Sequence, residues 1–247
     1  MVYEERTYRN LYEEKDLYHF QVVIDETDLD IAIIRDRYSQ KIYNIARDKI
    51  IQLRYELKEY IKRDIEFYES LKPHSPLPLA PVSIVEMCEK TKKANVGPMA
   101  AVAGLFAEQV GKALALFSSD VIVENGGDIW LKTSAIRRVG LYAGDSVFTA
   151  RVALEVSPSD TPLGICTSSA TVGHSLSFGK ADAVVILSPS AVLADAMATA
   201  VCNMVKSCDD LERAVDHALE MPGVIGAIAI LGDKMAVKGR VKLVPID

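Results

Sequence analysis

Several features that would place the chain in a membrane or on nucleic acid are missing. No apolar run in this 247-residue sequence reaches the roughly 20 residues that a membrane-spanning helix needs. The first residues, MVYEERTYRNLYEEKD, are polar and acidic, unlike a secretion signal. The formal net charge is -6, so the chain also lacks the positive excess of a general nucleic-acid binder. We therefore expect a cytoplasmic globular protein that binds neither membranes nor nucleic acid.

Residues and motifs of several common enzyme classes are also scarce. The chain has four cysteines without a CxxC pair, and four histidines without the spacing of a zinc site. We expect the cysteines to be small buried side chains in a reducing compartment. No GxSxG elbow, phosphate-binding P-loop or dinucleotide-binding GxGxxG occurs. These absences argue against a serine hydrolase of the usual type and against the common nucleotide-binding folds.

The residue pattern predicts a mixture of strands and helices. Two β-prone runs, Phe20–Ile24 and Leu29–Ile34, flank a polar turn and predict a hairpin. From Tyr38 to about Leu71, apolar residues recur at threes and fours, which is typical of one long amphipathic helix or of two helices with a bend. At the end of the chain, Val224–Leu231 and Met235–Val244 are expected to pair as strands.

The predicted fold class is α+β (mixed α/β). We expect one domain over residues 1–247, a single compact unit of packed β-sheets with surrounding helices. Within it, residues 1–82 would form the hairpin, the long helix and a proline-rich connection, and residues 83–247 would form the core. The apolar content of 49% makes a homodimer plausible.

The stretch Val184–Val205, VVILSPSAVLADAMATAVCNMV, predicts a buried strand, a turn and an apolar helix. Asp195, Thr199 and Asn203 fall at i, i+4 and i+8, on one face of that helix. A carboxylate in such a helix is costly unless it is paired, and this row could hold an oxygen-ligand cation. Alternatively, Asp195 bonds nearby backbone N–H groups and Thr199 bonds its own helix. The spacing alone leaves both interpretations open.

Two loops add candidate ligand contacts. Asn125-Gly126-Gly127-Asp128 could cradle an anion with its exposed N–H groups, or it could be a simple hairpin turn between two strands. By itself the pattern favours the hairpin. The hydroxyl-rich run that begins at Thr167 could bond a phosphate or a ribose, although such runs are also ordinary in loops.

Three segments taken in order resemble the ApbE family of flavin-transferring proteins. They are AGLFAEQVGKALALFSSDVIVENGG from Ala103 with the following Asp-Ile, the Thr167-Ser168-Ser169 run, and ADAMATA at Ala194–Ala200. The family has Lys-Gly and a later Asp in the first segment, a GGD loop, a TSG run with a histidine a few residues on, and ADALATA. The ordered segments cover the middle 40% or so of the chain.

The resemblance implies FAD bound with Mg²⁺, and FMN moved from FAD onto a threonine of an acceptor protein. It implies that Asp195 and Thr199 are metal ligands and that His174 is a catalytic acid, base or phosphate contact. The implied cofactor-binding residues are Gly104, Asn125, Gly126, Gly127, Asp128, Thr167 and Ser168.

The chain departs from the family pattern at two places. Ala103 stands where the family has lysine, and Glu108 stands where it has Asp. The family loop that follows the histidine is shortened after His174, with no Asp-Pro, and Lys180 could supply a charge there. Three functions remain open. The first is an Mg²⁺-dependent protein that binds or acts on FAD or a related flavin or dinucleotide phosphate and that could transfer FMN. The others are a flavin-binding protein without transfer chemistry and an enzyme that acts on another small anionic substrate.

Overall fold

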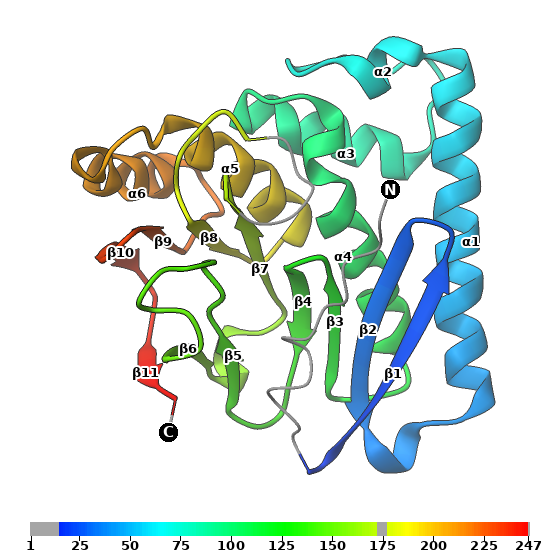
Figure 1. Ribbon diagram of the computed structural model, residues 1–247. Coiled ribbons are helices and arrows are strands. Elements are labelled where there is room, and N and C mark those ends of the chain that lie inside the picture. Colours follow the sequence, from blue (N-terminus) through cyan, green and yellow to red (C-terminus); the bar gives the residue numbers. More distant parts are fainter. Residues whose placement is uncertain (1–14, 172–176, 247) are drawn as a thin grey trace.

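An antiparallel sheet lies at the centre of the computed structural model, which describes residues 15–171 and 177–246. Its eight strands follow the order β1-β2-β3-β4-β7-β8-β9-β10. A second sheet of three strands has the order β11-β6-β5 (Figure 1). The strands are β1 (Leu17–Ile24), β2 (Thr27–Ile34), β3 (Val121–Asn125), β4 (Asp128–Lys132), β5 (Arg137–Gly140), β6 (Val152–Val156), β7 (Leu163–Ser168), β8 (Ala183–Ser188), β9 (Gly226–Leu231), β10 (Lys234–Gly239) and β11 (Leu243–Pro245).

Helices cover one face of the large sheet. Those that pack on its strands are α1 (Gln40–Arg63), α4 (Val102–Leu114), α5 (Ala191–Met204) and α6 (Leu211–Glu220), while α2 (Ile65–Glu69) and α3 (Val82–Ala94) pack on other helices. Helix α4 packs on β3 and β4, α5 on β7 and β8, and α6 on β9 and β10. Helix α1 lies along the β1–β2 hairpin and also contacts α4 (Figure 1). Helix α5 therefore sits over the middle of the sheet, beside α4.

Strand β8 explains why the sequence there is continuously apolar. All its residues are buried. Val184 and Ile186 belong to the core beneath the helices, whereas Val185 and Leu187 belong to a second core shared with the three-stranded sheet. Side chains of a strand alternate between its faces, so a strand that is covered on both sides needs apolar residues at every position.

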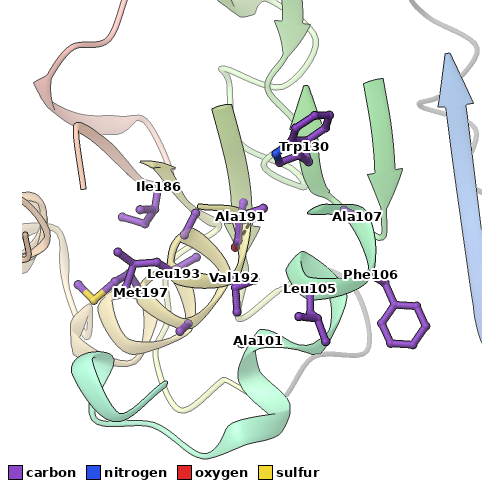
Figure 2. Packing of buried hydrophobic residues seen from close by; sticks show 14 of the residues in the cluster. Ala101, Leu105, Phe106, Ala107, Trp130, Ile186, Ala191, Val192, Leu193 and Met197 are labelled. Carbon is purple, nitrogen blue, oxygen red and sulfur yellow. Dashed lines mark hydrogen bonds between the residues drawn. The ribbon is translucent and has the colours of Figure 1, made fainter. Parts of the chain in front are cut away.

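Helices α4 and α5 approach each other closely at Gly104. A Cβ at this position would lie 2.5 Å from the carbonyl oxygen of Ala191 and 2.8 Å from the Cβ of Asp195. Around this contact, apolar side chains of both helices pack above β4 and β8, as Figure 2 shows for Leu105 and Val192. Glycine is therefore required where the two helices touch.

The structure confirms the α+β fold class and the expected hairpin, and it corrects one of the other expected elements. Of the two alternatives for the segment from Tyr38 to about Leu71, two helices with a bend is correct, since α1 ends at Arg63 and Asp64 caps α2 through the N–H of Phe67. The expected strand Met235–Val244 is wrong as one element. Its chain turns at Gly239, where φ is +83°, so β11 pairs with β6 in the small sheet.

Within the described ranges, no helix has both the length and the apolar character to cross a membrane.

The contact at Gly104 gives a first testable prediction. Gly104→Ala should lower the free energy of unfolding by about 3 kcal/mol, because the new methyl group collides with the backbone of α5. Urea unfolding followed by circular dichroism measures the change. Gly232→Ala is the control: its Cβ would meet nothing within 4 Å, and only its positive φ of +60° should cost about 1 kcal/mol. Equal losses in the two variants would contradict a collision at Gly104.

Candidate functional site

The candidate site begins where α4 and α5 cap each other. An oxygen of Asp195, on the second turn of α5, accepts a hydrogen bond of 2.8 Å from the N–H of Gly104 in the first turn of α4. In the opposite direction, Glu108 of α4 accepts hydrogen bonds from the start of α5, including one of 3.2 Å from the N–H of Val192. The first N–H groups of a helix have no acceptor within their own helix. Each carboxylate therefore supplies an acceptor for an N–H group at the start of the other helix.

The Asn125–Asp128 segment is a two-residue hairpin between β3 and β4. Asn125 pairs with Asp128, and both central glycines have positive φ, +66° at Gly126 and +97° at Gly127. This is the conformation that Gly-Gly hairpins adopt. The turn is fastened to its surroundings, because the Asn125 amide donates to the carbonyl of Ala103 at 3.2 Å and the N–H of Gly127 donates to Glu124 at 2.7 Å. The hairpin and the start of α4 are therefore held side by side.

Asp128 and Asp195 form a buried pair of acids. They are 6% and 9% exposed. Burial raises the pKa of Asp195 from 3.8 to about 7, although the N–H groups of Gly104 and Ala103 hold it down. Burial also raises the pKa of Asp128 well above its usual range, and the negative charge of Asp195 adds to this. Two negative charges are therefore unfavourable here unless a proton or a cation lies between them.

Three residues with hydroxyl groups, Thr167, Ser168 and Thr199, lie on the elements next to this pair of acids. The N–H of Thr167, near the end of β7, donates to Asp128 at 3.2 Å, and the Thr167 side chain lies next to Gly127. The buried hydroxyl of the following residue, Ser168, has no hydrogen-bond partner among the described residues. Thr199 is half-buried, one turn beyond Asp195 on the same face of α5.

The positions that the sequence singled out come together with two exceptions. Hydrogen bonds join Gly104 to Asp195, Thr167 to Asp128, and Asn125 to Ala103, the residue before Gly104. Gly127 lies next to Thr167. Gly126 and Ser168 are adjacent to these residues in the chain, and Thr199 lies one turn beyond Asp195 on α5. His174 lies outside the described residues. Asn203, the third member of the helical row, bonds a loop outside this group, since its side-chain oxygen accepts a hydrogen bond of 2.7 Å from the N–H of Phe178. For Asp195, the interpretation that it bonds a backbone N–H group is confirmed.

Glu108 is the residue that sequence reasoning missed. It appeared there only as a departure from a family motif. Its signal was a single acidic residue in the apolar segment Met99–Leu116, which predicts a buried helix. Because a buried carboxylate must find partners, this glutamate could have been expected to reach another element.

The donor atoms fit a hard cation and a phosphate-bearing ligand. The carboxylates of Asp195 and Asp128 and the hydroxyl of Thr199 are oxygen donors, which Mg²⁺ prefers. Within the described ranges, no three His, Cys, Asp or Glu side chains are arranged to hold a metal ion. A bound ion would therefore also need hydroxyl, backbone, water or ligand oxygens, the usual shell of Mg²⁺ in phosphate sites. The unpartnered Ser168 hydroxyl could bond such a ligand.

The sequence of this chain matches one family model and several related proteins. Residues 9–237 match the family model described as AbpE bacteria. A UPF0280 protein of Methanocella arvoryzae is 43% identical over 211 residues, covering 85% of this chain and 84% of that protein. A UPF0280 protein of Methanocaldococcus jannaschii is 38% identical over 233 residues, covering 92% and 93%.

Solved structures show the fold at much lower identity. The ApbE protein of Thermotoga maritima superposes with a TM-score of 0.59 at 15% identity, covering 90% of this chain and 96% of that one. The flavin transferase ApbE of Vibrio cholerae gives 0.56 at 14% identity, covering 91% and 97%. This chain thus has the fold of the ApbE flavin transferases. It belongs to the AbpE bacteria family, which it matches over most of its length.

The buried acids give a second prediction. The pKa of Asp195 is about 7 in the folded protein against an ordinary value of 3.8, so between these values the folded state holds a proton that the unfolded chain releases. Stability from this group is therefore present at low pH and lost as the pH rises towards 7. Asp195→Asn keeps an acceptor for Gly104 without the charge. The difference in unfolding free energy between this variant and the wild type should shift by roughly 2 kcal/mol in favour of the variant as the pH rises from about 5 to 8.

Denaturant unfolding at both pH values, in the presence of a chelator, measures this shift. Asp216→Asn, at an exposed position on α6, serves as the control and should follow the wild type. A difference between Asp195→Asn and wild type that does not change with pH would show that Asp195 is ionised in the fold throughout this range.

Proposed function

We propose that this chain binds FAD, or a related flavin or dinucleotide phosphate, together with Mg²⁺ at the site between α4, α5 and the Asn125–Asp128 hairpin. The observation that carries the proposal is the buried acid pair, Asp128 and Asp195, beside a glycine turn and hydroxyl groups. Such a pair must be neutralised by a proton or by a cation, and Mg²⁺ is the cation that carboxylate and hydroxyl oxygens bind well. The fold shared with flavin transferases supports a flavin as the ligand.

Asp195 and Thr199 would hold the metal ion, with Asp128 close by. When bound, Mg²⁺ would neutralise charge that develops on the pyrophosphate of FAD. The hydroxyls of Thr167 and Ser168 would bond the ligand, and the glycines of the turn would let it approach the backbone. Gly104 would hold Asp195 in place through its N–H.

FMN transfer is the more specific form of the proposal. An oxygen of an acceptor-protein hydroxyl would bond the FMN phosphorus while the pyrophosphate bond breaks and AMP leaves. His174 would take up the proton of the acceptor hydroxyl.

The alternative is a flavin-binding protein without transfer chemistry. Ala103 favours it, because no lysine charge is present at that position. An enzyme that acts on another small anionic substrate is the third candidate. The cytoplasmic location and the homodimer stay predictions from the sequence.

The deciding experiment follows flavin fluorescence and AMP release in a mixture of the protein, FAD and Mg²⁺. We expect saturable FAD binding that Mg²⁺ strengthens. Asp195→Ala should weaken the Mg²⁺-dependent part of the FAD affinity by about tenfold or more, because it removes a metal ligand and leaves Asp128 without a shared cation. Asp216→Ala is the matched control and should bind as wild type does.

The other outcomes separate the candidates. Protein-dependent AMP release would support transfer or hydrolysis of FAD, and stoichiometric binding without AMP would support the flavin-binding alternative. Failure of the wild type to bind FAD or FMN would contradict a flavin ligand. Because Asp195→Ala also removes a helix cap worth about 1 kcal/mol, circular dichroism must show that the variant is folded.

A further inference from the structure

The carboxylate of Glu108 is buried between two helices. Only 2% of this residue is exposed. One carboxylate oxygen accepts hydrogen bonds from the Val192 N–H and the Ser190 hydroxyl, each at 3.2 Å. The other oxygen pairs with the ammonium of Lys112, one turn further along α4, at 2.6 Å. Both oxygens therefore have partners, which is what a buried carboxylate requires.

Glu108 does more at α5 than supply an ordinary cap. Ser190 is already the N-cap of α5, since its hydroxyl oxygen accepts a hydrogen bond from the Leu193 N–H at 3.4 Å. The Val192 N–H is a separate donor in the same turn, and its acceptor comes from another helix. The contact therefore adds a link between α4 and α5, in addition to stabilising the end of α5.

Together with Asp195, this link attaches α5 to α4 at two points. Gly104 and Glu108 are four residues apart on α4, about one turn. Their partners on α5, Asp195 and Val192, are three residues apart. Two attachments on neighbouring turns fix both the rotation of α5 and its position along α4. Packing on β7 and β8 also restrains α5, and the second attachment adds a constraint at the α4–α5 contact itself.

We propose that Glu108 is a positioning residue that holds the start of α5 against α4 and thereby sets the Asp195 carboxylate in the orientation that binds Mg²⁺. The inference rests on the proposed function, because it concerns the metal at that same site. In this role Glu108 acts through its contacts with α5 and is not itself a ligand of the metal or the flavin.

The test compares two glutamates under the same substitution. Glu108→Gln has the same shape but lacks the charge, and its NH₂ group cannot accept a hydrogen bond. Glu86→Gln is the matched control. Glu86, on α3, accepts a hydrogen bond from Gln109 of α4 at 3.0 Å, and within the described ranges it makes none to α5. Isothermal titration with Mg²⁺ alone should show affinity about tenfold weaker in Glu108→Gln and within about twofold of wild type in Glu86→Gln.

A second measurement separates positioning from general damage. FAD binding by Glu108→Gln should return to the wild-type level at high Mg²⁺ concentration, because a misoriented ligand weakens metal binding without destroying the site. If Glu108→Gln does not fold, Ser190→Ala takes its place. It removes one of the two α5 donors to Glu108, and we expect about threefold weaker Mg²⁺ binding.

Three results would overturn the inference. Mg²⁺ binding that is the same in wild type and Glu108→Gln would contradict the role of Glu108 and leave the proposed function untouched. FAD binding by Glu108→Gln that stays low even at saturating Mg²⁺ would show general damage to the site and not a loss of positioning. If the wild type itself bound no Mg²⁺, the proposed function would fail first, and the role of Glu108 would fail with it.

Discussion

The packing of α4 against α5 depends on reciprocal hydrogen bonds, in which a carboxylate of each helix accepts from the first turn of the other helix. Asp195 of α5 accepts from the start of α4, and Glu108 of α4 accepts from the start of α5. These reciprocal bonds are possible only because Gly104 lets the backbones approach, since any side chain there would meet the Ala191 carbonyl. The same contact places Asp195 beside the hairpin that carries Asp128. The contact that packs α4 against α5 therefore also positions the acids of the candidate site.

Burial makes this arrangement of acids electrostatically demanding. Asp195 is stabilised by N–H groups, yet its pKa is raised to about 7, and the pKa of Asp128 is raised well above its usual range. A proton on one of the two acids would relieve their repulsion, and under the proposed function Mg²⁺ would take the place of that proton. A structural cap and a metal ligand are thus compatible roles for Asp195, because one of its oxygens bonds Gly104 and the carboxylate has a second oxygen.

Most of the secondary structure was predictable because local patterns carry it. The hairpin of β1 and β2, the amphipathic pattern of α1 and the apolar run of β8 each follow from burial on one or both faces. The strand expected over Met235–Val244 failed because apolar content does not reveal which sheet a segment joins. A turn at Gly239 sends β11 to the small sheet.

The sequence by itself determined the fold class, the family and the row of positions from which the site is built, because motifs and periodicity are local properties of the chain. Only the tertiary structure decided what those positions contact. It brought Asp128 to Asp195 across many residues, committed Asn203 to a loop, and gave Glu108 its partners on α5. These contacts depend on how closely two helices and a hairpin approach one another in space, and the spacing of residues along the chain does not specify that distance.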